Sequence, residues 1–311
     1  MDENITTPIT NTQLEADSVV MPHSEGSVIV DPTDDEVMVK AGEIIRNGGL
    51  VSFPTETVYG LGANALDVDA ATSIFTTKER PMTDPLIVHV YEKKDAYELI
   101  DEDEEIKEVF DILADKFWPG PFTCVMKANT DKISPVITAG TGYVGIRCPN
   151  HPVALKLIKE AQRPIAAPSA NKFGHVSPTK ADHVMYDFKN DSVYILDGGS
   201  SNFGIESTVV KIARETQDIE DPEEYHIKLW ILRRGGISEK EFALAISECH
   251  TQNKKIKLSV ECVKKKHFTE ESHKMEAPGQ FLRHYAPNLP SYMLSDDQLG
   301  EEDSLPLNLA G

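Results

Sequence analysis

Apolar residues recur along the chain in short blocks whose spacing alternates between helical and extended periods. The first block, at residues 37–45, places its apolar side chains on one helical face, and Asn47-Gly48-Gly49 supplies a stop. A β-rich run at residues 50–53 follows directly. Because helical and β-rich blocks continue to alternate, the pattern predicts an α/β fold.

The later elements continue this alternation. Helices are predicted near residues 70–77 and at 106–117, 153–161 and 239–249. Strands are predicted at 86–90, 123–127, 144–147, 165, 193–196, 207–212 and 229–232. Two polar stretches interrupt the order, and we expect a hairpin-loop insertion at 214–227 and an exposed linker at 250–276.

Residues 60–65, GLGANA, satisfy the dinucleotide-binding pattern G-x-G-x-x-A. That fingerprint requires an unbroken strand before the first glycine and a helix that opens at the last position. Here Pro54 breaks the preceding run and residues 66–69 read as a turn. We therefore reject a dinucleotide site.

Composition narrows the classes of protein. The 311 residues carry a net charge of −20 with a pI near 4.9, which argues against a general binder of nucleic acid or anionic membranes but allows a local basic cleft. No apolar run reaches membrane-spanning length. Residues 1–35 lack Lys and Arg and are predicted to form an acidic, disordered tail, unlike an Arg-rich presequence. The four cysteines form no C-x-x-C pair and follow no secretory signal, so we expect reduced thiols and a cytoplasmic protein.

Two pairs of polar residues are candidates for anion binding, because the chain has no phosphate-binding loop of the G-x-x-x-x-G-K-[ST] type. Lys78 and Arg80 precede Pro81 and can converge on one anion, although an isolated K-x-R is more often a solvated basic turn. Ser169 and Asn171 follow the apolar run 164–167, where α/β sheets present ligands, although S-x-N also forms ordinary turns.

An ordered set of motifs favours the functional interpretation of both pairs. Besides KERP at 78–81, it comprises FPTETVYGLG at 53–62, PLIVHV at 85–90, WPGPFT at 118–123, VGIRCP at 144–149, PIAAPSAN at 164–171, SPT at 177–179, GIESTVV at 204–210 and LRRGGI at 232–237. Together these motifs resemble the YrdC-like family of threonylcarbamoyl-AMP synthases. The resemblance implies a twisted, mostly open mixed sheet with flanking helices, in a catalytic domain at residues 36–249.

The resemblance also implies an activity. Such enzymes form L-threonylcarbamoyladenylate and pyrophosphate from L-threonine, bicarbonate and ATP with Mg²⁺, in the first step of making threonylcarbamoyladenosine in tRNA. A downstream threonylcarbamoyl transferase complex takes the product, and we expect tRNA to bind at most weakly. The reaction asks for positioning and charge neutralisation without a covalent nucleophile.

Site residues follow from the matched motifs. Lys78 and Arg80 are the expected catalytic residues. ATP is expected at Lys78, Arg80, Asp84, Tyr143, Ser169, Asn171, Ser177, Arg233 and Tyr285. L-Threonine is expected at Thr57, His89, Arg147, Ala167 and Ser207, with the Arg147 fork on its carboxylate and a neutral His89 as a candidate proton acceptor, although His89 also fits a core position.

Acids and histidines indicate no dedicated metal site. Glu56 and Glu206 are the acids inside strongly matched motifs, and either is a candidate to meet Mg²⁺ through phosphate and water. The ten histidines include no H-E-x-x-H and no paired Cys/His spacing, which argues against zinc.

Residues 278–287 resemble the linker that, in longer members of the family, folds over the ATP site before a C-terminal Rossmann-like domain. Tyr285 is then expected against the nucleotide, unless the segment is only a tether. The 24 residues after Pro287 are too few for that domain, so residues 250–311 are interpreted as a linker and lid with the C-terminal domain missing.

Two other classes of function stay open. One is a non-catalytic module of the same fold that binds double-stranded RNA or tRNA, which the net charge disfavours. The other is the carbamoyl-adenylate domain of hydrogenase maturation, whose C-x-x-C zinc pairs are lacking here.

Overall fold

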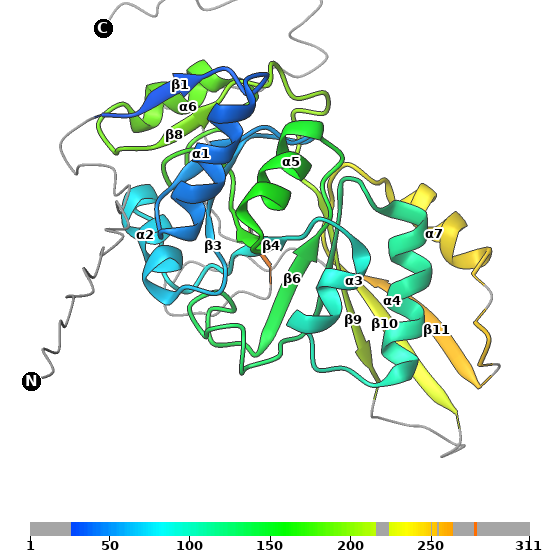
Figure 1. Cartoon of the computed structure of the whole chain (residues 1–311). Coiled ribbons are helices and arrows are strands. Elements are labelled where there is room, and N and C mark those ends of the chain that lie inside the picture. The colour runs from blue at the N-terminus through cyan, green and yellow to red at the C-terminus, as the bar shows by residue number, and fades with distance from the viewer. Residues whose placement is uncertain (1–25, 216–223, 250, 254, 264–276, 279–311) are drawn as a thin grey trace, which may run out of the picture.

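The computed structural model describes residues 26–215, 224–249, 251–253, 255–263 and 277–278 (Figure 1). Its strands are β1 (Val28–Val30), β2 (Val51–Phe53), β3 (Gly60–Asn64), β4 (Ile87–His89), β5 (Phe122–Lys127), β6 (Tyr143–Arg147), β7 (Ile165–Ala166), β8 (Tyr194–Leu196), β9 (Thr208–Arg214), β10 (Tyr225–Arg233) and β11 (Ile256–Cys262). Its helices are α1 (Asp35–Arg46), α2 (Val68–Lys78), α3 (Lys93–Ala96), the 3-10 helix η1 (Tyr97–Leu99), α4 (Glu104–Phe117), α5 (Pro152–Ala161), α6 (Ala181–Phe188) and α7 (Glu239–Ser247).

The described strands form one mixed, open sheet in the order β1-β8-β2-β3-β7-β4-β6-β5-β9-β10-β11. The sheet contains parallel pairs, such as β4 with β6, and antiparallel pairs, such as β4 with β7. Because β1 and β11 end the order, the sheet has two edges and does not close. The predicted α/β class and the open mixed sheet are therefore confirmed.

Local sequence signals account for the main helices. The Asp34 side chain caps α1 by accepting a hydrogen bond from the Glu36 N–H, and Asp103 caps α4 in the same way through the Ile106 N–H. The apolar stripe of α1 packs with α5, and Figure 1 shows these two helices side by side over one half of the sheet. Helices α4 and α7 lie over the other half, which contains β9, β10 and β11.

The side-chain alternation of the strands decides which residues reach the site. Val88, Cys124 and Ile146 of β4, β5 and β6 point into the main hydrophobic core. Since neighbouring residues on a strand face opposite sides, His89 and Arg147 point to the other face, and the sheet register pairs them directly. This face carries the pocket described below.

Two segments that the sequence placed outside the catalytic domain form strands of the sheet. Val28–Val30, placed in the disordered tail, form β1 because they pair in parallel with β8. Ile256–Cys262, placed in the exposed linker, form β11 because they pair in parallel with β10. Both are edge strands whose partners are distant or separated by a loop, so their own residues gave a weak signal. Residues 1–25 lie outside the described part of the chain.

Several elements were not predicted, and they include β3, α3, η1 and α6. Both glycines of the rejected dinucleotide motif lie in β3, so they are strand residues and do not form a strand-to-helix turn. The predicted turn at 66–69 is partly wrong, since α2 begins at Val68 under an Asp67 cap. Strands β9 and β10 pair antiparallel, as expected for a hairpin, although they extend into the predicted loop 214–227. Within the described residues no helix combines the length and apolar character that crossing a bilayer requires.

Gly62 is expected to be required for packing between β2, β3 and β7. A Cβ there would lie 2.7 Å from Cε1 of Phe53 and 2.8 Å from Cγ2 of Ile165. Gly62→Ala should therefore lower the free energy of unfolding by about 1–3 kcal/mol in urea denaturation. Gly60→Ala, whose Cβ would meet no atom closer than 3.3 Å, is the matched control. Equal stability of Gly62→Ala and the wild type would contradict this packing role.

Candidate active site

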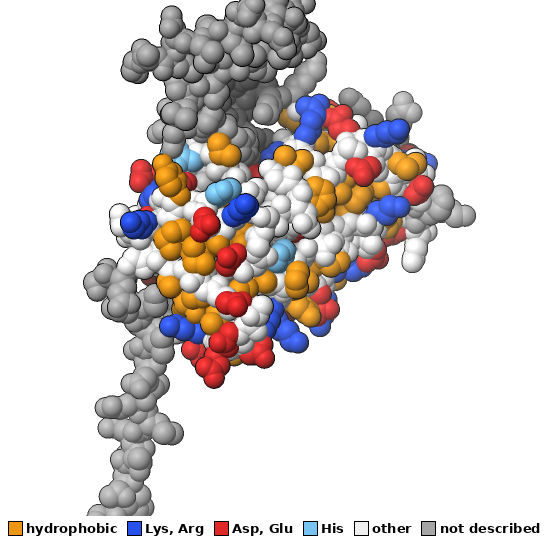
Figure 2. All heavy atoms as spheres, turned by 90° about the horizontal axis from the view of Figure 1, so that it is seen from above, with side chains coloured by type: hydrophobic (Ala, Val, Ile, Leu, Met, Phe, Trp, Pro, Cys, Tyr) orange, Lys and Arg blue, Asp and Glu red, His pale blue; other side chains and the backbone are white. Residues whose placement is uncertain are grey.

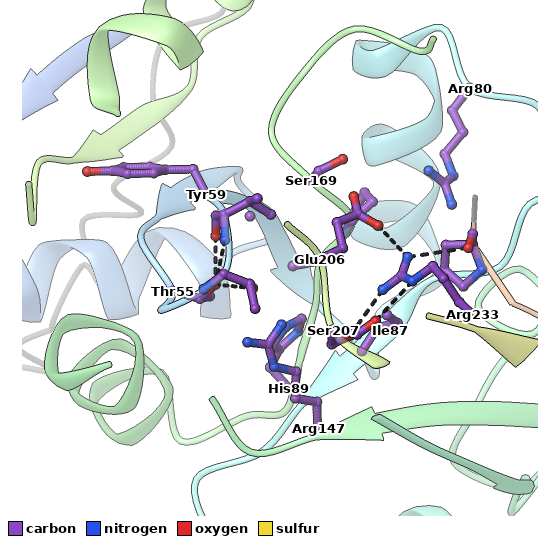
Figure 3. Close-up of a pocket in the computed structure, with 16 residues that line it drawn as sticks. Thr55, Tyr59, Arg80, Ile87, His89, Arg147, Ser169, Glu206, Ser207 and Arg233 are labelled. Atoms are coloured by element: carbon purple, nitrogen blue, oxygen red, sulfur yellow. Dashed lines mark hydrogen bonds and ion pairs between the residues drawn. The ribbon is translucent and has the colours of Figure 1, made fainter. Parts of the chain in front are cut away.

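A pocket opens on the face of the sheet opposite the main core (Figure 3). Its walls come from the β2–β3 connection, the end of α2, strands β4 and β6, the segment after β7, the start of β9, the end of β10 and the residue Pro278. The lining residues are Thr55, Thr57, Val58, Tyr59, Gly60, Arg80, Ile87, His89, Arg147, Ala167, Pro168, Ser169, Glu206, Ser207, Arg233 and Pro278.

Arg147 ends β6 at one side of this pocket and is buried. Its Nη2 lies 2.6 Å from Oε1 of Glu56, and its Nε donates to the Gly120 carbonyl at 3.2 Å. Nη1 has no hydrogen-bond partner among the described residues. The guanidinium is thus held along one edge and retains donors for an incoming carboxylate.

His89 lies beside Arg147 and is 5% exposed. Its ring meets the Phe53 ring edge-on at 5.8 Å, and its buried Nδ1 has no hydrogen-bond partner among the residues that the structure describes. Burial, together with the Arg147 charge, lowers the pKa of His89 to about 3. The imidazole is therefore neutral at pH 7, as expected, but so low a pKa makes it a poor proton acceptor. Its unpartnered nitrogen suits a hydrogen bond to a ligand.

Two pairs of hydroxyl groups form hydrogen bonds in the pocket wall. Thr57 Oγ1 lies 2.8 Å from Thr55 Oγ1, which donates to the Val58 carbonyl. Ser207 Oγ lies 2.8 Å from Thr123 Oγ1 and accepts from Nη2 of Arg233 at 3.0 Å. Each of these hydrogen bonds orients one hydroxyl group, that of Thr57 or of Ser207, which the sequence analysis expects at L-threonine.

Arg233 connects this wall to the end of the described chain. Its Nη1 pairs with Oε2 of Glu206 and donates to the Pro278 carbonyl at 3.3 Å. Ser177 Oγ donates to the other oxygen of Glu206 at 3.2 Å. The last described residue, Pro278, therefore lies in the pocket wall, whereas Tyr285 lies outside the described residues.

Arg80 faces the pocket from the end of α2 (Figure 3). Its Nη2 lies 3.0 Å from Oδ2 of Asp84, without hydrogen-bond alignment, and also donates to the Pro85 carbonyl at 2.9 Å. Burial raises the pKa of Asp84 to about 6 against the opposing charge of Arg80. Asp84 does not line the pocket, so it supports Arg80 from behind.

Lys78 does not line the pocket that Arg80 faces. Its buried ammonium donates to the Ser169 carbonyl at 2.6 Å and to the Asn171 carbonyl. Burial, followed by the charge of Arg80, lowers the pKa of Lys78 well below its usual value. The Asn171 amide in turn donates to the carbonyls of Lys172 and His175. Lys78 and Asn171 therefore shape the loop that presents Ser169.

The structure brings most of the predicted residues together. Those on the pocket wall are Thr57, Arg80, His89, Arg147, Ala167, Ser169, Ser207 and Arg233. Four other predicted residues do not line the pocket but hydrogen-bond or pair with residues that do. They are Lys78, Asp84, Asn171 and Ser177. Tyr143 starts β6, four residues from Arg147 at the strand's other end, and its ring lies under Lys211 Nζ at 3.8 Å, so it does not line the pocket.

Other lining residues were not predicted as site residues. They are Thr55, Val58, Tyr59, Gly60, Ile87, Pro168, Glu206 and Pro278, although Glu206 had been considered for Mg²⁺. Most belong to the motifs FPTETVYGLG and PIAAPSAN, so membership of a motif was the available signal. Tyr59, for example, donates through its hydroxyl to the Gly199 carbonyl at 2.7 Å.

The described residues contain no group of three or more His, Cys, Asp or Glu side chains that could hold a metal ion. Glu56 is occupied by Arg147 and by the Asn150 N–H, and it does not line the pocket. Glu206 lines the pocket and pairs with Arg233. Within the described part of the chain, Glu206 is therefore the acid of the lining that could contribute to binding a cation.

The chain is similar to proteins of one family. The Sua5/YciO/YrdC family model, whose description is telomere recombination, matches residues 43–235. Threonylcarbamoyl-AMP synthase of Bacillus subtilis is 38% identical over 258 residues, covering 83% of this chain, and that of Pyrococcus abyssi is 42% identical over 256 residues, covering 81%. The chain spans 66% of the length of each relative.

Solved structures agree with this likeness. The crystal structure of P. abyssi Sua5 complexed with L-threonine has a TM-score of 0.68 at 38% identity, and the match covers 84% of this chain and 68% of that one. Escherichia coli YciO, at 19% identity and a TM-score of 0.53, shares the fold over 70% of this chain and 98% of its own.

The buried His89 should make stability depend on pH. Its pKa is about 3 in the folded chain and about 6.5 when unfolded, so between these values the unfolded chain binds the extra proton. Stability should then fall as the pH drops through this window. Between pH 7.5 and 4.5 the wild type should lose on the order of 2 kcal/mol more unfolding free energy than His89→Gln.

Urea denaturation at the two pH values measures this difference, and the exposed His183→Gln is the matched control. Parallel losses in the wild type and His89→Gln would show that His89 does not titrate as a buried neutral imidazole.

Proposed function

Because the chain belongs to the Sua5/YciO/YrdC family, we propose that it is a threonylcarbamoyl-AMP synthase. The proposed reaction converts L-threonine, bicarbonate and ATP into L-threonylcarbamoyladenylate and pyrophosphate. The observation that supports the proposal is the pocket itself, where Arg147 and neutral hydrogen-bonding groups share one cavity with Arg80 and Arg233. A zwitterionic amino acid and a polyphosphate together require this combination.

We assign L-threonine to the side of the pocket lined by His89 and Arg147. Figure 3 shows these two side chains together, with Ser207 between them and Arg233. The Nη1 side of Arg147 would bind the carboxylate, and the unpartnered His89 nitrogen would bind an amine or hydroxyl group. Ile87 and Ala167 supply apolar wall for a methyl group.

We assign the ATP phosphates to the opposite side, where Figure 3 places Arg80 and Ser169. Arg80 and Arg233 supply charge, and the Ser169 hydroxyl supplies a neutral donor. Lys78, which the sequence placed on the phosphates, would act through the Ser169 loop in the state described here. Mg²⁺ would enter on the ATP phosphates, with Glu206 as the acid of the lining able to reach it through water.

This arrangement serves an in-line displacement. The threonine amine attacks the bicarbonate carbon, and loss of water gives a carbamate. A carbamate oxygen then attacks the α-phosphorus of ATP while the bond to the β-phosphate oxygen breaks, and pyrophosphate leaves with the electron pair. Arginine donors stabilise the charge on the phosphoryl oxygens in the transition state. His89 positions the amine and does not remove its proton, because its pKa is about 3.

The product would be passed to a transferase that moves the threonylcarbamoyl group to adenosine in tRNA. A module that binds RNA directly is less well supported, because acidic and basic side chains are interspersed on the face shown in Figure 2. A continuous basic stripe would be expected on such a surface.

Pyrophosphate release tests the proposed function. With ATP and Mg²⁺ present, release should require both L-threonine and bicarbonate, and omission of either should remove it. Arg80→Ala should lose most of the activity, because a charge-assisted contact to the transition state is worth roughly 2–4 kcal/mol. Release that is independent of threonine would refute the assignment.

Arg147→Lys should separate the two substrates. An ammonium cannot reproduce the planar donor array of a guanidinium, so the KM for threonine should rise at least about tenfold more than the KM for ATP. Arg214→Lys, at an exposed arginine outside the pocket, is the matched control. Equal increases for the two substrates would remove Arg147 from the carboxylate site.

A further inference from the structure

Glu56 is a buried acid with no contact to the pocket, although its neighbours Thr55 and Thr57 both line it. Its residue surface is 3% exposed. A carboxylate in such a place is costly unless its charge and its lone pairs are satisfied. The partners of Glu56 therefore indicate why the chain keeps an acid there.

The side chain of Glu56 has two partners, one for each oxygen. Oε1 accepts from Nη2 of Arg147 at 2.6 Å, and Oε2 accepts from the Asn150 N–H at 3.1 Å. The Gly120 carbonyl accepts from Nε of the same arginine at 3.2 Å. These contacts fix the plane of the guanidinium along its Nε–Nη2 edge and leave Nη1 for a ligand.

The main chain of the same segment holds the residues that lead to Ser207. The Glu56 carbonyl accepts from the N–H groups of Asn202 and Phe203 at 3.1 and 3.0 Å, and the Thr57 carbonyl accepts from Gly204 at 3.0 Å. Residues 202–204 lead to Ser207, which lines the pocket. A side-chain substitution at residue 56 leaves these backbone contacts available, so the effect of the carboxylate on Arg147 can be tested separately.

We propose that Glu56 is the positioning residue for Arg147, and that it sets the affinity for the amino-acid substrate without touching it. The inference rests on the proposed function, because it takes the ligand of Arg147 to be the carboxylate of threonine. It replaces the expectation that Glu56 meets Mg²⁺, since both of its oxygens already accept hydrogen bonds and neither faces the pocket.

Glu56→Gln is the decisive substitution. A glutamine of the same shape has one oxygen and one NH₂ group, and the NH₂ group must then face either the Arg147 guanidinium or the Asn150 N–H, both of which are donors. The guanidinium should lose its fixed orientation, which costs up to about 100-fold when a binding group is displaced by about 1 Å. The KM for threonine should rise about 10- to 100-fold, with the KM for ATP within about twofold of wild type.

A matched control and a double mutant make the test specific. Glu105→Gln removes the acid of another arginine pair, with Arg214, which lies outside the pocket, and should behave as wild type. In an Arg147→Lys background, Glu56→Gln should change the KM for threonine less than about twofold further, because the group that it positions is gone. Additive effects of the two substitutions would refute the proposal.

Threonine binding supplies a second readout. L-Threonine should raise the Tm of the wild type and should raise that of Glu56→Gln much less at the same concentration. If Glu56→Gln does not fold, Glu56→Asp keeps the charge and withdraws the carboxylate by one methylene, and its threonine KM should rise selectively. An unchanged threonine KM, or equal increases for threonine and ATP, would overturn the positioning role. A wild-type chain without threonine-dependent pyrophosphate release would instead refute the proposed function.

Discussion

Three arginines line the pocket, and each is paired with a carboxylate of the same chain. The pairs are Arg147 with Glu56, Arg80 with Asp84, and Arg233 with Glu206. A guanidinium buried without a counter-charge would cost several kcal/mol, so the acids are a condition for placing these donors in a cavity. The acids come from three different segments, and the site therefore exists only when the sheet has brought those segments together.

Burial shifts the pKa values of several ionisable groups in and around the pocket towards their neutral forms. Burial raises the pKa of Asp84 to about 6 and lowers that of His89 to about 3. Both shifts favour the neutral form, and the positive charge of Arg147 adds to the effect on His89. Lys78 has two carbonyl partners in place of a carboxylate partner, and its pKa falls as well. The pocket therefore concentrates its fixed charge on the arginines, whose position the carboxylates control.

The C-terminal boundary of the described fold belongs to the same network. The Pro278 carbonyl accepts a hydrogen bond from Arg233, and Ala277 packs in a small cluster with Val209 and Leu232. Arg233 thus contacts Ser207, just before β9, as well as Glu206 and Pro278. This arrangement makes the last described residue part of the pocket wall.

The sequence by itself determined the α/β class, the long amphipathic helices and, through its motifs, most of the pocket wall, because periodicity and motif identity are local properties. It did not reveal β1 or β11, since an edge strand is defined by a partner elsewhere in the chain. It also assigned Lys78 and Tyr143 to ATP, and neither lines the pocket of the described structure, because a residue type specifies chemistry and not direction. Only the tertiary structure decided which way each side chain points, since strand register and burial select one face. For the same reason it alone turned Glu56 from a metal candidate into the partner of Arg147.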